Sequence, residues 1–96
     1  MSIGLAIQKI GEYTAKYDLY SSYVRDIQGL LEIEGLQAIA QGGQVNQHTQ
    51  ENLRKKLAVY MYLQGLYKDF VEYWKQVIQS IHAVIKSIQE LAQGAR

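Results

Sequence analysis

Apolar residues recur every three or four positions along almost the whole chain of 96 residues, and no proline interrupts them. This spacing runs from Ile3 to Leu31 in the first half and from Leu53 to Leu91 in the second. Steps of three and four residues place side chains on one face of an α-helix, whereas the strict alternation typical of strands is nowhere sustained. Because proline is absent, no position forbids a helix. The sequence therefore predicts an all-α chain.

A polar segment with two adjacent glycines separates the two halves. It reads Gln41-Gly42-Gly43-Gln44-Val45-Asn46-Gln47-His48-Thr49. Glycine commonly ends a helix, and asparagine and threonine are suited to cap the start of the next. We therefore expect Gly42 to end the first helix, and Asn46 or Thr49 to cap the second.

These signals predict one domain, residues 1–96, folded as a long antiparallel helical hairpin. Helix one is expected over about 3–41, the loop over about 42–49 and helix two over about 50–93. The apolar register slips just before Gly35, and glycine costs about 1 kcal/mol in a helix interior. The sequence therefore leaves two alternatives open at Gly35, a helix one that continues, straight or bent, and a helix one that is broken there.

The register of the hairpin follows from folding the chain back around Gly42. If facing residues have numbers that sum to 84, apolar residues meet apolar residues along both helices. The expected pairs are Leu31 with Leu53, Ile27 with Leu57, Val24 with Tyr60, Tyr17 with Tyr67, Ile10 with Trp74, Ile7 with Val77 and Ile3 with Ile81. The same register predicts a belt of facing tyrosines halfway along the hairpin, formed by Tyr13, Tyr17, Tyr20, Tyr23, Tyr60, Tyr62, Tyr67 and Tyr73.

Two features of helix two are left without a partner in this hairpin. Its last residues extend beyond the point at which helix one begins, and its apolar face is wider than the two positions in seven of a coiled-coil seam. Large exposed apolar surfaces usually mark interfaces. We therefore expect the hairpin to assemble into a bundle or filament, with itself or with another helical protein. The candidate interface residues are Tyr67, Val71, Trp74, Ile78, Val84, Ile85, Ile88 and Leu91.

Few residues carry the chemistry of an enzyme. Cysteine is absent, which removes disulfides and thiolate sites, and the two histidines, His48 and His82, lie far apart without a carboxylate at ligand spacing. No nucleophile, base and orienting group stand together in the sequence pattern. We therefore predict a chain that is not an enzyme, with no catalytic residue, no metal site and no cofactor.

Charge gives no strong indication of a nucleic-acid or lipid partner. Ten basic and nine acidic residues leave a net charge of +1, and the basic run is Arg54-Lys55-Lys56. Such a run is more often a solvated helix face than a phosphate contact, although a regulator that binds nucleic acid through it is a third alternative.

No segment has the length of a membrane span. The charge-free stretch 76–85 is far shorter than the roughly 20 residues that a spanning helix needs. The N-terminus lacks a basic region followed by a long apolar core, so a cleaved signal peptide is not expected. The default expectation is a cytoplasmic protein, or one exported without a cleaved signal.

Part of the chain resembles the needle subunits of type III secretion systems. Ile27-Gln28-Gly29 is similar to a Leu-Gln-Gly segment of that family, and Lys56-Leu57, Tyr60, Val71, Trp74-Lys75 and Val77 follow its second-helix spacing. The resemblance covers about residues 27–85. It departs from the family in the turn, which lacks proline here, and in the continuation from Ser87 to Arg96. The resemblance implies a helical hairpin that stacks into a tube outside the cell.

The function that we expect is therefore that of a structural subunit that associates with itself, in a filament or a needle-like assembly. The alternative is a small helical adaptor or chaperone whose apolar face holds one helix of a partner.

Overall fold

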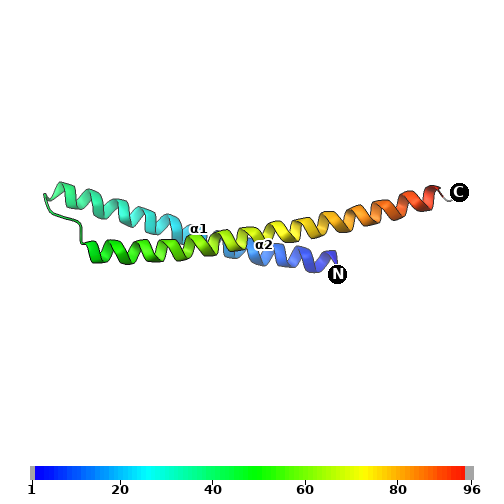
Figure 1. The fold of residues 1–96 in the computed structure, drawn as a ribbon, viewed down its shortest axis with the longest axis horizontal. Coiled ribbons are helices and arrows are strands. Elements are labelled where there is room, and N and C mark those ends of the chain that lie inside the picture. The colour runs from blue at the N-terminus through cyan, green and yellow to red at the C-terminus, as the bar shows by residue number, and fades with distance from the viewer. Residues whose placement is uncertain (1, 95–96) are drawn as a thin grey trace.

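The computed structural model describes residues 2–94 and contains two helices, α1 (Ile3–Ala40) and α2 (Gln47–Gly94), with no strand among these residues. The two helices lie antiparallel and form the predicted all-α hairpin (Figure 1). The molecule measures 83 × 18 × 14 Å. Its radius of gyration is 22.6 Å, against about 13 Å for a compact domain of 100 residues. The fold is a rod two helices thick.

A strict heptad pattern holds α1 against α2. The residues of α1 that lie at steps of three and four are buried or half-buried, and they are Ile3, Ala6, Ile10, Tyr13, Tyr17, Tyr20, Val24, Ile27, Leu31 and Glu34. Their counterparts on α2 are Ile81, Ile78, Trp74, Val71, Tyr67, Gln64, Tyr60, Leu57, Leu53 and Gln50. We call these two rows the seam. Alternating steps of three and four are the repeat of a coiled coil, in which such side chains face the partner helix.

The predicted register, with facing numbers that sum to 84, is confirmed by contacts across the seam. The Gln50 side-chain amide donates a hydrogen bond of 3.2 Å to a carboxylate oxygen of Glu34, which is the facing residue in this register. At the middle of the seam, the Gln64 amide donates to the Ser21 hydroxyl at 2.8 Å. Gln50 and Gln64, the two polar residues of α2 in the seam, therefore each have a hydrogen-bond partner on α1, as buried polar groups usually do.

Aromatic rings fill the middle of the seam, and the predicted belt is confirmed in most of its members. Tyr20 stacks on Tyr67 with ring centroids 5.7 Å apart, and Tyr13 lies 5.1 Å from Phe70. Further pairs join Tyr13 to Tyr67 and Tyr60 to both Tyr20 and Tyr23. Tyr62 and Tyr73 are exposed, and Tyr73 packs against Trp74 of its own helix instead.

One predicted seam position is wrong near the N-terminus. Ile7 was expected to face Val77, but its side chain is 59% exposed, whereas the neighbouring Ala6 is fully buried and faces Ile78. The heptad reaches position 6, not position 7, after a step of three from Ile3. The small Ala6 therefore lies inside the seam, and the larger Ile7 points away from it.

The turn between the helices has the hydrogen bonds of a Schellman motif. Gly42 lies at φ +67, its N–H donates to the carbonyl oxygen of Ile39, and the Gly43 N–H donates to that of Ala38. Asn46, rather than Thr49, caps α2, because its side-chain oxygen accepts the Thr49 N–H at 3.2 Å. Helix α2 therefore begins at Gln47, three residues before its predicted start, and α1 ends at Ala40.

Of the two alternatives at Gly35, the structure has the continuous helix. Helix α1 continues through Gly35 to Ala40, and a Cβ placed on Gly35 would meet no atom within 4 Å. The apolar register slips there because two apolar rows run along this end of α1. One row faces α2, and the other lies on the outside of the hairpin.

Two glycine substitutions are expected to have opposite effects on stability. Gly35→Ala should raise the free energy of unfolding by about 1 kcal/mol, because alanine is the better helix former and open space surrounds the position. Gly42→Ala should lower it by about 1–2 kcal/mol, because the left-handed backbone conformation strains any residue with a Cβ. Urea titration of both variants, followed by circular dichroism, checks the two signs. A loss of stability in Gly35→Ala would contradict the continuous helix.

Within residues 2–94, neither helix combines the length and the apolar character that crossing a lipid bilayer requires.

Candidate interaction surface

The C-terminal part of α2 extends beyond the hairpin. In Figure 1 the N-terminus of α1 lies well short of the C-terminal end of α2, which continues alone. The last half-buried residue of α2 is Ile81, which faces Ile3, and every residue from 82 to 94 is exposed. We call residues 82–94 the overhang. At a rise of 1.5 Å per residue it is about 20 Å long.

Apolar side chains form a continuous row on the overhang. Val84, Ile88 and Leu91 follow at steps of four and three residues, and Ile85 lies beside them. Their exposed fractions run from 42% at Ile85 to 74% at Leu91. The two charged residues, Lys86 and Glu90, each lie two positions beyond a member of this row. That is about 200° around the helix, so the row itself is free of charge.

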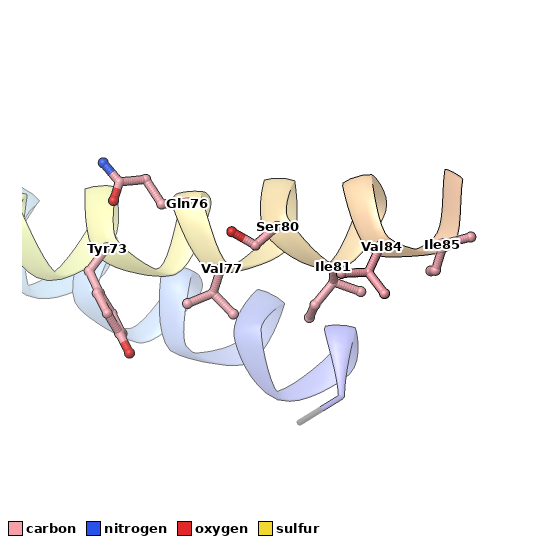
Figure 2. Close-up of a pocket in the computed structure, with 7 residues that line it drawn as sticks. All are labelled: Tyr73, Gln76, Val77, Ser80, Ile81, Val84 and Ile85. Atoms are coloured by element: carbon pink, nitrogen blue, oxygen red, sulfur yellow. The ribbon is translucent and has the colours of Figure 1, made fainter. Parts of the chain in front are cut away.

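An open groove of about 440 Å³ marks the place where the seam ends and the overhang begins. Figure 2 shows its lining residues on α2, with the Val77 and Ile81 side chains directed to the side on which the first turns of α1 lie. Val84 and Ile85 continue the same lining past the end of α1. Because one helix supplies every lining residue and the groove is open, its shape suits the side chains of another helix better than an enclosed small molecule.

The eight candidate interface residues divide between the seam and the overhang. Tyr67 and Val71 belong to the seam, where Val71 is 9% exposed and Tyr67 packs on Tyr13 and Tyr20. Trp74 and Ile78 are half-buried seam residues as well. These four side chains already pack between the two helices of the hairpin. The exposed members are Val84, Ile85, Ile88 and Leu91.

A second apolar surface was missed in the sequence. Leu30, Ile33, Leu36 and Ile39 are between 49% and 78% exposed on the outside of α1 near the turn. Ile33, Leu36 and Ala40 each lie two positions beyond a seam-side residue of α1, on the opposite side of that helix from α2. We call Ile33, Leu36, Ile39 and Ala40 the turn-end row. The signal in the sequence was the slip of the apolar register before Gly35, for which a break or a bend of helix one was considered instead of a second row.

The basic run and His48 are solvated. Arg54, Lys55 and Lys56 are all exposed, and the Lys55 ammonium lies 3.5 Å from a carboxylate oxygen of Glu51 on the same helix. His48 contacts Asn52 at 3.4 Å. Among residues 2–94, no three histidine, aspartate or glutamate side chains gather at a spacing that could hold a metal ion. The exposed surfaces that call for a partner are therefore apolar ones.

Comparison with models of protein families, with curated proteins and with solved structures finds no match for this chain.

Proposed function

We propose that this protein is a non-enzymatic structural subunit that associates with copies of itself, and that the assembly is a filament. The observation that carries the proposal is the overhang, in which every residue is exposed while Val84, Ile85, Ile88 and Leu91 form an uncharged apolar row. Exposed apolar rows of this kind are typical of protein interfaces.

The thin core supports the same proposal. Only Ala6, Val24, Ile27 and Val71 are buried among the described residues, and no large side chain there is fully enclosed. Domains bury the apolar faces of their helices by packing layers of secondary structure together. A rod of two helices has no third layer, so the outward faces of both helices stay uncovered. Contacts with further copies would supply that layer.

A needle-like filament is the specific form that we propose. The resemblance of residues 27–85 to needle subunits of type III secretion systems supports it, as does the elongated hairpin of 83 Å. In such an assembly the protein would act outside the cytoplasm after export without a cleaved signal.

Concentration-dependent assembly tests the proposed function. Light scattering over a dilution series should show a mass that rises with concentration without reaching a fixed oligomer, and negative-stain microscopy should show filaments. Replacing Arg54, Lys55 and Lys56 by glutamine is the matched control and should change neither result, because exposed charges contribute little. A chain that stays monomeric or dimeric at every concentration would contradict the filament and favour the adaptor, whose overhang holds a helix of another protein.

A further inference from the structure

We infer that the overhang of one copy docks on the turn-end row of a second copy, antiparallel to its α1, so that the copies join head to tail. This inference rests on the proposed self-association and adds to it the two surfaces, their register and their polarity.

Continuity with the seam indicates what kind of partner the overhang needs. The apolar face of α2 runs without interruption from Ile81 through Ile85 and Ile88. Over its first part this face is covered by an antiparallel helix, α1 of the same chain. The same geometry, continued past the N-terminus of α1, requires another antiparallel helix with apolar residues at heptad spacing.

The turn-end row of a second copy meets this requirement. Along the overhang the steps from Leu91 back to Val84 are three and then four residues, and along α1 the steps from Ile33 to Ala40 are also three and then four. An antiparallel contact therefore pairs Ile33 with Leu91, Leu36 with Ile88 and Ala40 with Val84, and the numbers of each pair sum to one constant, as they do in the seam. Ile39 and Ile85 have the same sum and flank the contact. Alternating steps of three and four on both helices are what knobs-into-holes packing needs.

The apolar side chains of both rows are exposed, and one charged side chain borders them. Leu36 and Ile88 are both 60% exposed, and Ile33 and Leu91 are 52% and 74% exposed, so all four side chains are free to meet another copy. On the overhang, Lys86 and Glu90 lie two positions beyond Val84 and Ile88, about 200° around the helix, so these two pairing positions carry no charge beside them. On α1 of the second copy, the exposed Glu32 lies four positions before Leu36 and therefore beside the turn-end row, where it borders the contact.

The alternative contact, overhang against overhang, gives a partner to only one of the two exposed rows of each copy. It would pair Ile88 with Ile88 of a second copy and leave the turn-end row exposed in both copies. Head-to-tail docking covers both rows at once. Because the two surfaces differ, the contact is heterologous and does not close on itself, which is the condition for open-ended growth.

The register also fixes how far the copies advance. Within one chain Leu36 lies level with position 48 of α2, whereas the docked Leu36 lies level with Ile88 of the other copy. The difference of about 40 residues corresponds to an advance of about 60 Å along the long axis. All copies joined in this way point in the same direction.

Cross-linking between two single-cysteine chains tests the register, because the natural chain contains no cysteine. Chains with Leu36→Cys and with Ile88→Cys, mixed and mildly oxidised, should form a mixed disulfide. The matched control replaces Ile88→Cys by Gln93→Cys, which lies on the far face of the overhang and should stay unlinked. A double variant cannot link within one chain, since its two thiols would be about 60 Å apart.

Charged variants test the same contact without oxidation. Leu36→Glu and Ile88→Glu should each fold, since both positions are exposed, and each alone should remain monomeric. The Leu36→Glu chain keeps an intact overhang, and the Ile88→Glu chain keeps an intact turn-end row. Mixed together, the two chains should therefore form a dimer of one copy of each and grow no further. Circular dichroism of each variant checks that folding is unchanged.

The outcomes separate this inference from the proposed function. Filaments of the natural chain combined with no mixed disulfide would overturn the register and leave self-association standing. Rapid linking of Ile88→Cys to itself, with normal dimers of Leu36→Glu, would show the overhang-to-overhang contact instead. A natural chain that is monomeric at all concentrations would overturn both.

Discussion

Removal of the residues after Lys86 should abolish assembly and leave the hairpin folded. The shortened chain loses Ile88 and Leu91, which lie beyond the end of α1 and are 60% and 74% exposed, so little intramolecular core disappears. Each contact between subunits loses apolar surface worth about 25 cal/mol per Å². Sedimentation should show a monomer at concentrations at which the full chain assembles. Circular dichroism of dilute samples should show a similar unfolding temperature for both, apart from the stability that association itself adds.

A substitution at constant length controls for the missing helix. Ile88→Gln combined with Leu91→Gln keeps good helix formers at both positions and should block assembly as the truncation does. Gln89→Ala combined with Gln93→Ala changes two residues outside the apolar row and should assemble normally. A truncated chain that assembles like the full one would refute the role of the overhang. Unfolding of the truncated monomer would instead show that α1 depends on these residues.

Ile27→Ala should destabilise the hairpin by about 2–5 kcal/mol, which is the range for removing a buried isoleucine side chain. Ile27 is 7% exposed and is one of the few buried residues in a seam only two helices thick. Because native proteins are stable by only about 5–15 kcal/mol, this loss is a large fraction of the total. Urea unfolding of dilute protein, followed by circular dichroism, measures the change.

Ile7→Ala is the matched control for this substitution. The residue type is the same, but the Ile7 side chain is 59% exposed outside the seam, so the change in free energy of unfolding should stay within about 0.5 kcal/mol. If Ile7→Ala cost as much as Ile27→Ala, Ile7 rather than Ala6 would be the residue that enters the seam. Equal and small effects of both would show that α1 and α2 do not pack as described.

The hairpin and its register could be predicted from the sequence because local rules and tertiary packing agree along most of the chain. Apolar residues at steps of three and four specify helices, and Gly42 ends the first of them. Two helices joined by a short turn must lie antiparallel, so their facing positions are fixed by arithmetic alone. The overhang follows from the same arithmetic, since α2 is longer than α1.

Details that depend on where each side chain points required the tertiary structure. Ile3, Ala6 and Ile7 all lie close to one face of the helix, and only the full burial of Ala6 beside the exposed Ile7 shows which of the two enters the seam. Likewise, the width of the apolar face of α2 predicted partners on more than one side. The structure shows that α1 itself covers part of this face, because Val71 is buried and Tyr67 stacks on Tyr20. Sequence periodicity gives the face of a helix to within a residue, whereas burial depends on the shape of the opposite surface.

The turn-end row shows this division most clearly. The sequence by itself determined that apolar residues near Gly35 depart from the first register, because this is a property of spacing alone. Only the tertiary structure decided that α1 stays helical there, with Glu34 facing Gln50 on the inside and Ile33 and Leu36 exposed on the outside. The physical reason is that a helix has two sides and the hairpin covers only one of them, so a second apolar row becomes visible as a surface only once the first has been buried.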